Sequence, residues 1–220
     1  YWVQSRVDGD VWVFMEYIPS LNRKISPTPP YLLKIIPKLA KLHALTYNHR
    51  YAKYKKRFEP WLPAYSSQLN IAARKLFIEK TEAYLKEALE RPGTQQLIEP
   101  SYSLLISMLH QGPGLYPEIL EAGQCVVHND LAIKNICSSH LKNRDWRIKF
   151  IDWESARFQP CWFDLVNLVE QFFRYEKNRS RKHEERIIRR CSRLYAHEMK
   201  KHGILFKIAP LKLYKMASLQ

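Results

Sequence analysis

Apolar residues in this chain recur mainly every three or four positions, with a few short alternating runs between the periodic segments. This spacing is typical of amphipathic helices. Helices are predicted over 32–45, from Asn70 to Pro92-Gly93, over 100–110, from about Cys161, over 184–201 and after Pro210. Pro37 falls inside the first of these segments and predicts an interruption or a kink there.

Short alternating runs predict strands over 1–4, 11–14, 125–127 and 146–151. The first two are joined across Asp8-Gly9-Asp10, a favourable hairpin turn. The predicted fold class is therefore α+β and mainly helical, with a short N-terminal hairpin and a small β element in the second half. At 220 residues the chain can bury one sizeable core.

The β element frames a set of polar residues that can carry phosphoryl transfer. His128-Asn129-Asp130 follows an apolar strand, Asn135 comes five residues after Asp130, and Asp152 follows the next predicted strand. Transfer from a nucleotide needs a carboxylate that orients a hydroxyl, and an amide and a second carboxylate that hold Mg²⁺ against the phosphates. The spacing thus predicts the catalytic and metal loops of a phosphotransferase.

A purely structural interpretation of the same residues also exists. His128 can be a hydrogen-bonded core histidine and Asp130 a turn or cap residue. Three features favour the catalytic interpretation: the loop follows an apolar strand, Asp152 arrives on a second one, and His128 lies two residues before the expected base.

Five segments resemble, in order along the chain, motifs of the aminoglycoside phosphotransferase and choline kinase-like superfamily. The segments are Phe14-Met15-Glu16-Tyr17-Ile18, 39–45, the loop 128–135, Ile151-Asp152-Trp153-Glu154 and Cys161-Trp162-Phe163-Asp164-Leu165. The resemblance covers most of the chain and implies a protein-kinase-like C-terminal lobe. A fainter likeness to spore-coat-associated bacterial members also exists.

The resemblance implies a role for each site residue. Asp130 would be the base or orienting carboxylate, supported by His128, and Asn135 and Asp152 would be the Mg²⁺ ligands. The segment Glu16, Tyr17, Ile18 would bind adenine through its backbone. The donor would be ATP, with GTP as the alternative, and the acceptor a small-molecule hydroxyl. Asp164 is expected to cap the helix it begins, His43 to be a packed histidine, and Glu154 to face either metal or solvent.

The sequence departs from the family pattern at two positions of the loop. Asn129 stands where glycine is usual, and asparagine tolerates unusual backbone angles better than most residues. Ala132 stands where a second histidine is usual. Neither change affects the expected base or the metal ligands.

No glycine-rich loop or phosphate-pairing lysine precedes the hinge segment. We therefore expect residues 1–18 to be the last hairpin and hinge of an N-terminal lobe that is otherwise missing, and 19–220 to be a catalytic lobe truncated at its end. A fragment of this kind would be inactive alone and would need the missing lobe of the same protein.

The chain carries a formal net charge of +15, concentrated in 50–57 and 174–193. Such runs usually form solvated helix faces, so nucleic acid is not an expected partner, although a basic nucleic-acid-binding module is one alternative class. A non-catalytic kinase-fold interaction protein is the other. The charge favours a neutral or anionic acceptor over a polycationic one, in a pocket that the family builds from the region between Tyr51 and Leu120.

Four widely spaced cysteines argue against a zinc site or a disulfide framework and suit a reducing compartment. The sequence shows no signal peptide and no apolar stretch long enough to span a bilayer. The cytoplasm is the expected location.

Overall fold

The structure is a computed structural model that describes residues 2–5, 11–14, 16–18, 20, 29–50, 62, 65, 68–138, 146–174 and 180–220. Its helices are α1 (Pro29–Thr46), α3 (Gln68–Glu90), α4 (Pro92–Ile98), α5 (Tyr102–Gln111), α6 (Pro117–Glu121), α7 (Phe163–Phe173), α8 (Arg181–Lys201) and α9 (Pro210–Leu219). Its strands are β1 (Trp2–Ser5), β2 (Val11–Phe14), β3 (Gln124–Val127), β4 (Ile136–Ser138), β5 (Ile148–Phe150) and β6 (Arg157–Pro160). The predicted α+β, mainly helical fold is confirmed.

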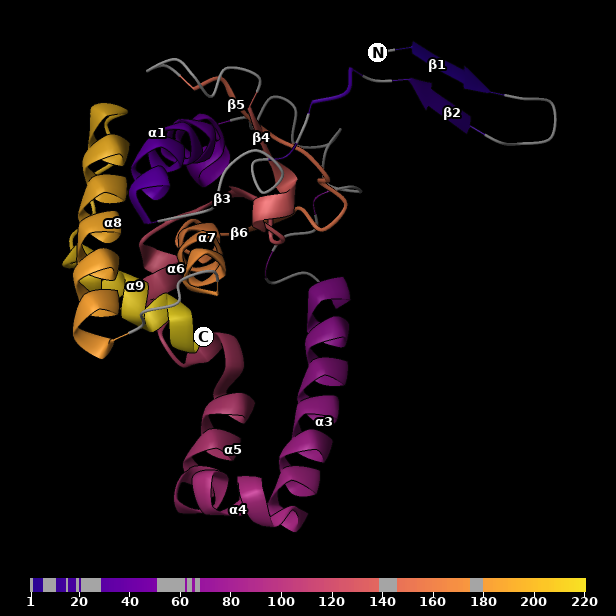
Figure 1. Cartoon of the computed structure of the whole chain (residues 1–220), viewed down its shortest axis with the longest axis vertical. Helices are drawn as coiled ribbons and strands as arrows, with labels where there is room; N and C mark the ends of the chain where they lie inside the picture. The colour runs from indigo at the N-terminus through magenta and orange to yellow at the C-terminus, as the bar shows by residue number, and fades with distance from the viewer. Residues whose placement is uncertain are drawn as a thin grey trace.

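The core lies where α1, α7, α8 and α9 pack together (Figure 1). Helix α1 buries Leu32, Ile35, Ile36 and Leu39, which share one face at the helical period. The helix continues through Pro37, so the predicted interruption is wrong, while the alternative, a kink, stays a prediction. A proline removes only one backbone hydrogen bond, and the buried face of the helix stabilises it across that point.

Helices α3, α4 and α5 form an arm that projects from this lobe (Figure 1). The helical spacing of Phe77, Thr81, Tyr84, Leu85, Ala88 and Leu89 predicts an apolar stripe along α3. Phe77 and Tyr84 are exposed, whereas the other four are half-buried. Among the described elements, α4 and α5 pack against α3, and much of the apolar surface of α3 stays in contact with solvent.

The strands form three antiparallel pairs, β1 with β2, β3 with β6, and β4 with β5. The predicted hairpin strands pair in the register Trp2 with Phe14, while its turn at Asp8-Gly9-Asp10 lies outside the described residues. The two predicted strands near the site have different partners, β6 and β4, which the sequence did not predict. The loop between β3 and β4 and the loop between β5 and β6 carry the candidate site.

Within the described ranges, no helix is both long and apolar enough to cross a membrane. All four cysteines are buried and free, as expected for a chain without a disulfide framework. Of the two basic clusters, 51–57 and 175–179 lie outside the described residues. Arg50 is described, and its guanidinium donates hydrogen bonds to the carbonyls of Ala44 and His202.

Candidate active site

The loop from His128 to Asn135 leaves β3, makes a single 3₁₀ turn over Ile133–Asn135 and enters β4. Leu131 and Ile133 are buried and anchor it to the core. Asn129 has φ 65°, a left-handed conformation that glycine usually supplies. The expectation that asparagine can replace glycine at this position is confirmed.

Asp130 and Asn135 are in direct contact. The Asn135 side-chain amide donates to the Asp130 carbonyl at 2.9 Å and to its Oδ2 at 3.0 Å. Because both partners only accept, the amide nitrogen must face them and the amide oxygen must face away. The Asp130 carboxylate is 41% exposed, and Lys134 Nζ lies 3.5 Å from its Oδ2. A solvent-accessible carboxylate is thereby held in a fixed orientation beside a buried amide.

Asp152 lies next to this pair because the backbones of the two loops are joined. The Ile151 N–H donates to the Asn135 carbonyl at 3.0 Å. His128 Nε2 donates to the Ile151 carbonyl at 2.7 Å, and its Nδ1 accepts from the Asp130 N–H at 3.4 Å. Asp152 is exposed and has φ 66°, so the chain turns sharply at the carboxylate. His128 thus bonds to the backbone of both loops, and its supporting role in catalysis stays a prediction.

Asp164, the second residue of α7, is fully buried and does not cap its own helix. Its Oδ2 accepts from the His128 N–H at 2.6 Å and its Oδ1 from the Asn129 N–H at 2.9 Å. The predicted structural role is therefore correct, but the predicted capping is wrong. The carboxylate instead binds two loop amides that have no strand or helix partner of their own.

His43 and Tyr195 extend the hydrogen-bonded support of the loop beneath Asp164. No pattern in the sequence predicted these contacts. His43 Nε2 lies 3.2 Å from Asp164 Oδ2 and its Nδ1 lies 2.7 Å from the Tyr195 hydroxyl. A carboxylate only accepts, so Nε2 carries a proton. Burial raises the pKa of Tyr195 well above its usual range, which keeps the hydroxyl neutral. His43 is a packed histidine, as predicted.

The hinge segment lies against the same β element. Lys149 Nζ on β5 contacts the Glu16 carboxylate at 3.0 Å, and Ser20 forms an isolated antiparallel bridge with Cys137 on β4. Tyr17 is 74% exposed. Met15 lies outside the described residues. The prediction that Glu16, Tyr17 and Ile18 bind adenine stays a prediction, since it concerns their backbone and a nucleotide.

The donor set fits Mg²⁺ shared with phosphate. Among the described residues no group of three or more His, Cys, Asp or Glu side chains can hold a metal. Mg²⁺ is normally bound by one or two protein oxygens, with water and phosphate oxygens completing an octahedron. The Asp152 carboxylate and the Asn135 amide oxygen, which faces away from Asp130, are ligands of this kind. Glu154 is exposed on the same loop.

The helical lobe with its two polar loops has a kinase-like fold. A family model described as "Phosphotransferase enzyme family" matches residues 4–190. The chain belongs to that family. This confirms the resemblance inferred from the sequence.

One solved kinase has a similar fold at low sequence identity, and two further structures match less closely. The choline kinase of Cryptosporidium parvum Iowa II is 12% identical with a TM-score of 0.53, over 95% of this chain and 60% of that one. The Plasmodium vivax ethanolamine kinase is 14% identical with a TM-score of 0.46, over 95% and 62%. LicA in complex with AMP is 15% identical with a TM-score of 0.35, over 98% and 70%.

The chain therefore spans about three fifths of the first two structures. A search of the curated proteins found no match.

Proposed function

We propose that the protein containing this lobe transfers the γ-phosphoryl group of ATP to a hydroxyl of a small molecule. The observation that carries the proposal is the pairing of Asp130 and Asn135, at 3.0 Å between Oδ2 and Nδ2, on a loop held by buried Asp164. Membership of a phosphotransferase family supports it. GTP is the alternative donor.

In this proposal Asp130 orients the acceptor hydroxyl and accepts its proton as the phosphoryl group transfers. The carboxylate is accessible, and the Asn135 amide fixes the direction of one oxygen. Positioning of this kind supplies most of the rate enhancement in phosphoryl transfer. Asn135 and Asp152 would hold Mg²⁺, which neutralises charge on the phosphates when bound. His128 keeps the two loops together.

Adenine would bind along the backbone of 16–18, which the Glu16–Lys149 ion pair and the Ser20–Cys137 bridge support by fixing that segment beside β4 and β5. The sequence contains no glycine-rich loop followed by a phosphate-pairing lysine. We therefore propose that turnover needs this lobe joined to a part that supplies them, and that the 220 residues alone are inactive.

The test is Asp130→Asn in the complete protein, assayed with labelled ATP against a panel of hydroxyl acceptors. Loss of a general base or orienting carboxylate lowers the rate by about 10²–10⁴-fold. Glu121→Gln, which alters an exposed carboxylate at the end of α6, is the matched control and should keep full activity. Both variants should unfold at the same denaturant concentration as the wild type.

Activity of Asp130→Asn within tenfold of the wild type would remove this residue from the reaction. An unmodified protein that transfers phosphate to no acceptor, and hydrolyses no ATP, would favour the alternative of a non-catalytic kinase-fold interaction protein.

A further inference from the structure

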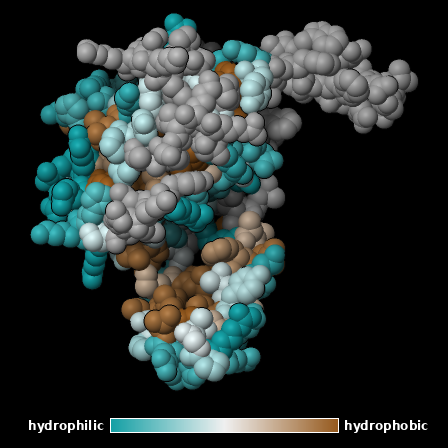
Figure 2. All heavy atoms as spheres, in the orientation of Figure 1, coloured by the Kyte–Doolittle hydropathy of each residue, from teal (hydrophilic) through white to brown (hydrophobic). Residues whose placement is uncertain are grey.

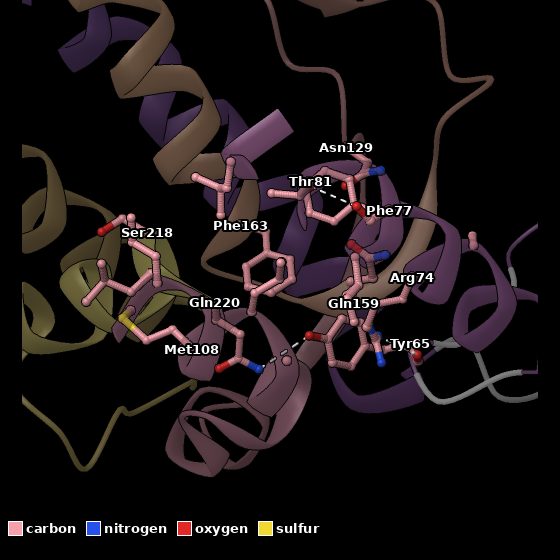
Figure 3. Close-up of a pocket in the computed structure, with 17 residues that line it drawn as sticks. Tyr65, Arg74, Phe77, Thr81, Met108, Asn129, Gln159, Phe163, Ser218 and Gln220 are labelled. Atoms are coloured by element: carbon pink, nitrogen blue, oxygen red, sulfur yellow. Dashed lines mark hydrogen bonds between the residues drawn. The ribbon is translucent and has the colours of Figure 1, made fainter. Parts of the chain in front are cut away.

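A cavity of about 720 Å³ lies between the arm and the lobe, beside the catalytic loop. Helices α3 and α5 form one wall, and β6, α7 and the end of α9 form the other (Figure 3). Asn129 lines the cavity and is adjacent to Asp130 in the chain. A site of this size, lined by the residue that precedes the candidate base in the chain, can hold a small molecule and present its hydroxyl to the loop.

The walls are mainly apolar, and the only charged described side chain that lines them is Arg74. Phe77, Met108 and Phe163 contribute large apolar surfaces (Figure 3). Brown hydrophobic side chains gather where the arm meets the lobe (Figure 2). No described residue of the lining is acidic. An ammonium group entering this space would meet the Arg74 guanidinium and no acidic side chain of a described residue.

Arg74 is fixed in place by groups that do not neutralise it. Its guanidinium lies 4.6 Å from the centre of the Tyr65 ring and donates to the Tyr65 carbonyl at 3.4 Å. Its Cδ lies 3.6 Å from the point where a side chain at Gly112 would begin. No ion pair between described residues includes Arg74. Most of its five N–H donors remain available to an anion.

Tyr65 could otherwise have offered its ring face to an ammonium group, because aromatic faces attract cations. Arg74 occupies that contact. Tyr65 is itself buried and held by Gln220, whose side-chain amide donates to its hydroxyl at 3.3 Å. The Tyr65 ring face is therefore occupied by the Arg74 guanidinium, which attracts anions.

We infer that this cavity is the acceptor site and that its ligand is an amphiphilic alcohol: an apolar body, a hydroxyl at one end and an acidic group that pairs with Arg74. The inference rests on the proposed function and specifies its substrate class. The apolar body would displace water from Phe77, Met108 and Phe163, and the acid would pair with the guanidinium in a partly buried setting. The hydroxyl end would lie toward Asn129 and Asp130.

Three probes of equal chain length test the charge preference: 10-hydroxydecanoate, 1,10-decanediol and (10-hydroxydecyl)trimethylammonium. Binding to the complete protein is measured by calorimetry. We expect the carboxylate to bind about tenfold or more tightly than the cation, which corresponds to about 1.4 kcal/mol. Equal affinity for all three, or tightest binding of the cation, would overturn the inference.

Variants on α3 test whether the Arg74 side chain causes the preference for the carboxylate probe. Arg74→Gln should weaken carboxylate binding about tenfold while leaving the diol unchanged, and Arg74→Lys should restore part of the loss. Lys80→Gln removes an exposed cation from the same helix but outside the cavity, and should change nothing. Carboxylate binding that is insensitive to Arg74→Gln, in a variant that unfolds like the wild type, would refute the assignment.

Phosphoryl transfer to the bound probe separates this inference from the proposed function. Arg74-dependent binding of 10-hydroxydecanoate supports the site whether or not the probe is phosphorylated. If the protein phosphorylates no acceptor, the proposed function fails while the binding result stands. The protein could instead phosphorylate other alcohols at a rate that neither Arg74→Gln nor added 10-hydroxydecanoate changes. In that case the proposed function stands and the inferred site fails.

Discussion

The backbone N–H of His128 donates a hydrogen bond of 2.6 Å to Oδ2 of Asp164, which lies 36 residues later in the chain. The next amide, that of Asn129, bonds to the other oxygen of the same carboxylate at 2.9 Å. A single buried side chain on α7 thus fixes two consecutive peptide units immediately before Asp130. The direction in which the candidate base leaves the loop is set by this pairing.

Replacing Asp164 with asparagine should destabilise the fold. The amide would turn an N–H group toward a backbone N–H and remove the charge opposite His43 Nε2, which lies 3.2 Å away. Loss of one partner of a buried ionic group typically costs about 3–5 kcal/mol. Urea denaturation measures it. Asp152→Asn, on an exposed carboxylate, is the control and should shift the free energy of unfolding by less than about 0.5 kcal/mol. A similarly small shift for Asp164→Asn would show that the carboxylate is not the support described.

Gly123 directly precedes strand β3, and the absence of a side chain there leaves room for Tyr47. It has φ +96°, and a Cβ there would overlap the ring and hydroxyl of Tyr47, which donates to the Ala122 carbonyl at 2.9 Å. Gly123→Ala should therefore cost about 1–2 kcal/mol in backbone strain and a further 1–3 kcal/mol in overpacking.

Gly203→Ala is the matched comparison for Gly123→Ala. Gly203 has φ +76° and open space around the missing Cβ, so only the strain component applies. Thermal or chemical unfolding of both variants isolates the clash with Tyr47. Equal losses of stability in the two variants would mean that Tyr47 moves aside without cost.

Most of the helices and the order of the site motifs could be predicted because they depend on local signals. The helical period over 184–201 and the glycine after it predict the last residue of α8 and place its beginning three residues late. The spacing of Asp130, Asn135 and Asp152 likewise identifies the two loops of the site. Periodicity and motif spacing are properties of neighbouring residues, so a single sequence carries them.

The support beneath the site could not be predicted because it joins residues far apart in sequence. His43 contacts Tyr195 across 152 positions and Asp164 across 121. Strand β6, with the sequence Arg-Phe-Gln-Pro, has little strand character and forms only because β3 offers it a partner. The charge of the cavity beside Asn129 also depends on how α3 and α5 meet the lobe, which no local pattern specifies.

The buried thiols predict how stability changes with pH. Burial raises the pKa of Cys161 and of Cys191 to about 12, from an ordinary value near 9. Between pH 9 and 12 the unfolded chain loses these protons while the folded chain keeps them, so the free energy of unfolding should fall as pH rises through that window and be at its full value below pH 9.

Labelling with Ellman's reagent at pH 8 provides the companion measurement. A neutral buried thiol is a poor nucleophile, so all four cysteines should react only as fast as the protein unfolds. Cys191→Ala should make the loss of stability above pH 9 less steep. Rapid labelling of any of the four in the native protein would contradict the burial described.

Metal binding should depend on nucleotide. Asp152 is an exposed carboxylate and Asn135 a neutral amide, and Mg²⁺ keeps most of its waters unless phosphate oxygens help to replace them. Mn²⁺, followed by electron paramagnetic resonance, should therefore bind this chain weakly alone and much more tightly to the complete protein with ATP. Asp152→Ala should abolish the effect of ATP on Mn²⁺ binding. Glu154→Ala, on the same loop, should keep that effect, which distinguishes a metal ligand from a solvated neighbour. Tight Mn²⁺ binding without nucleotide that survives Asp152→Ala would place the metal elsewhere and overturn the ligand assignment.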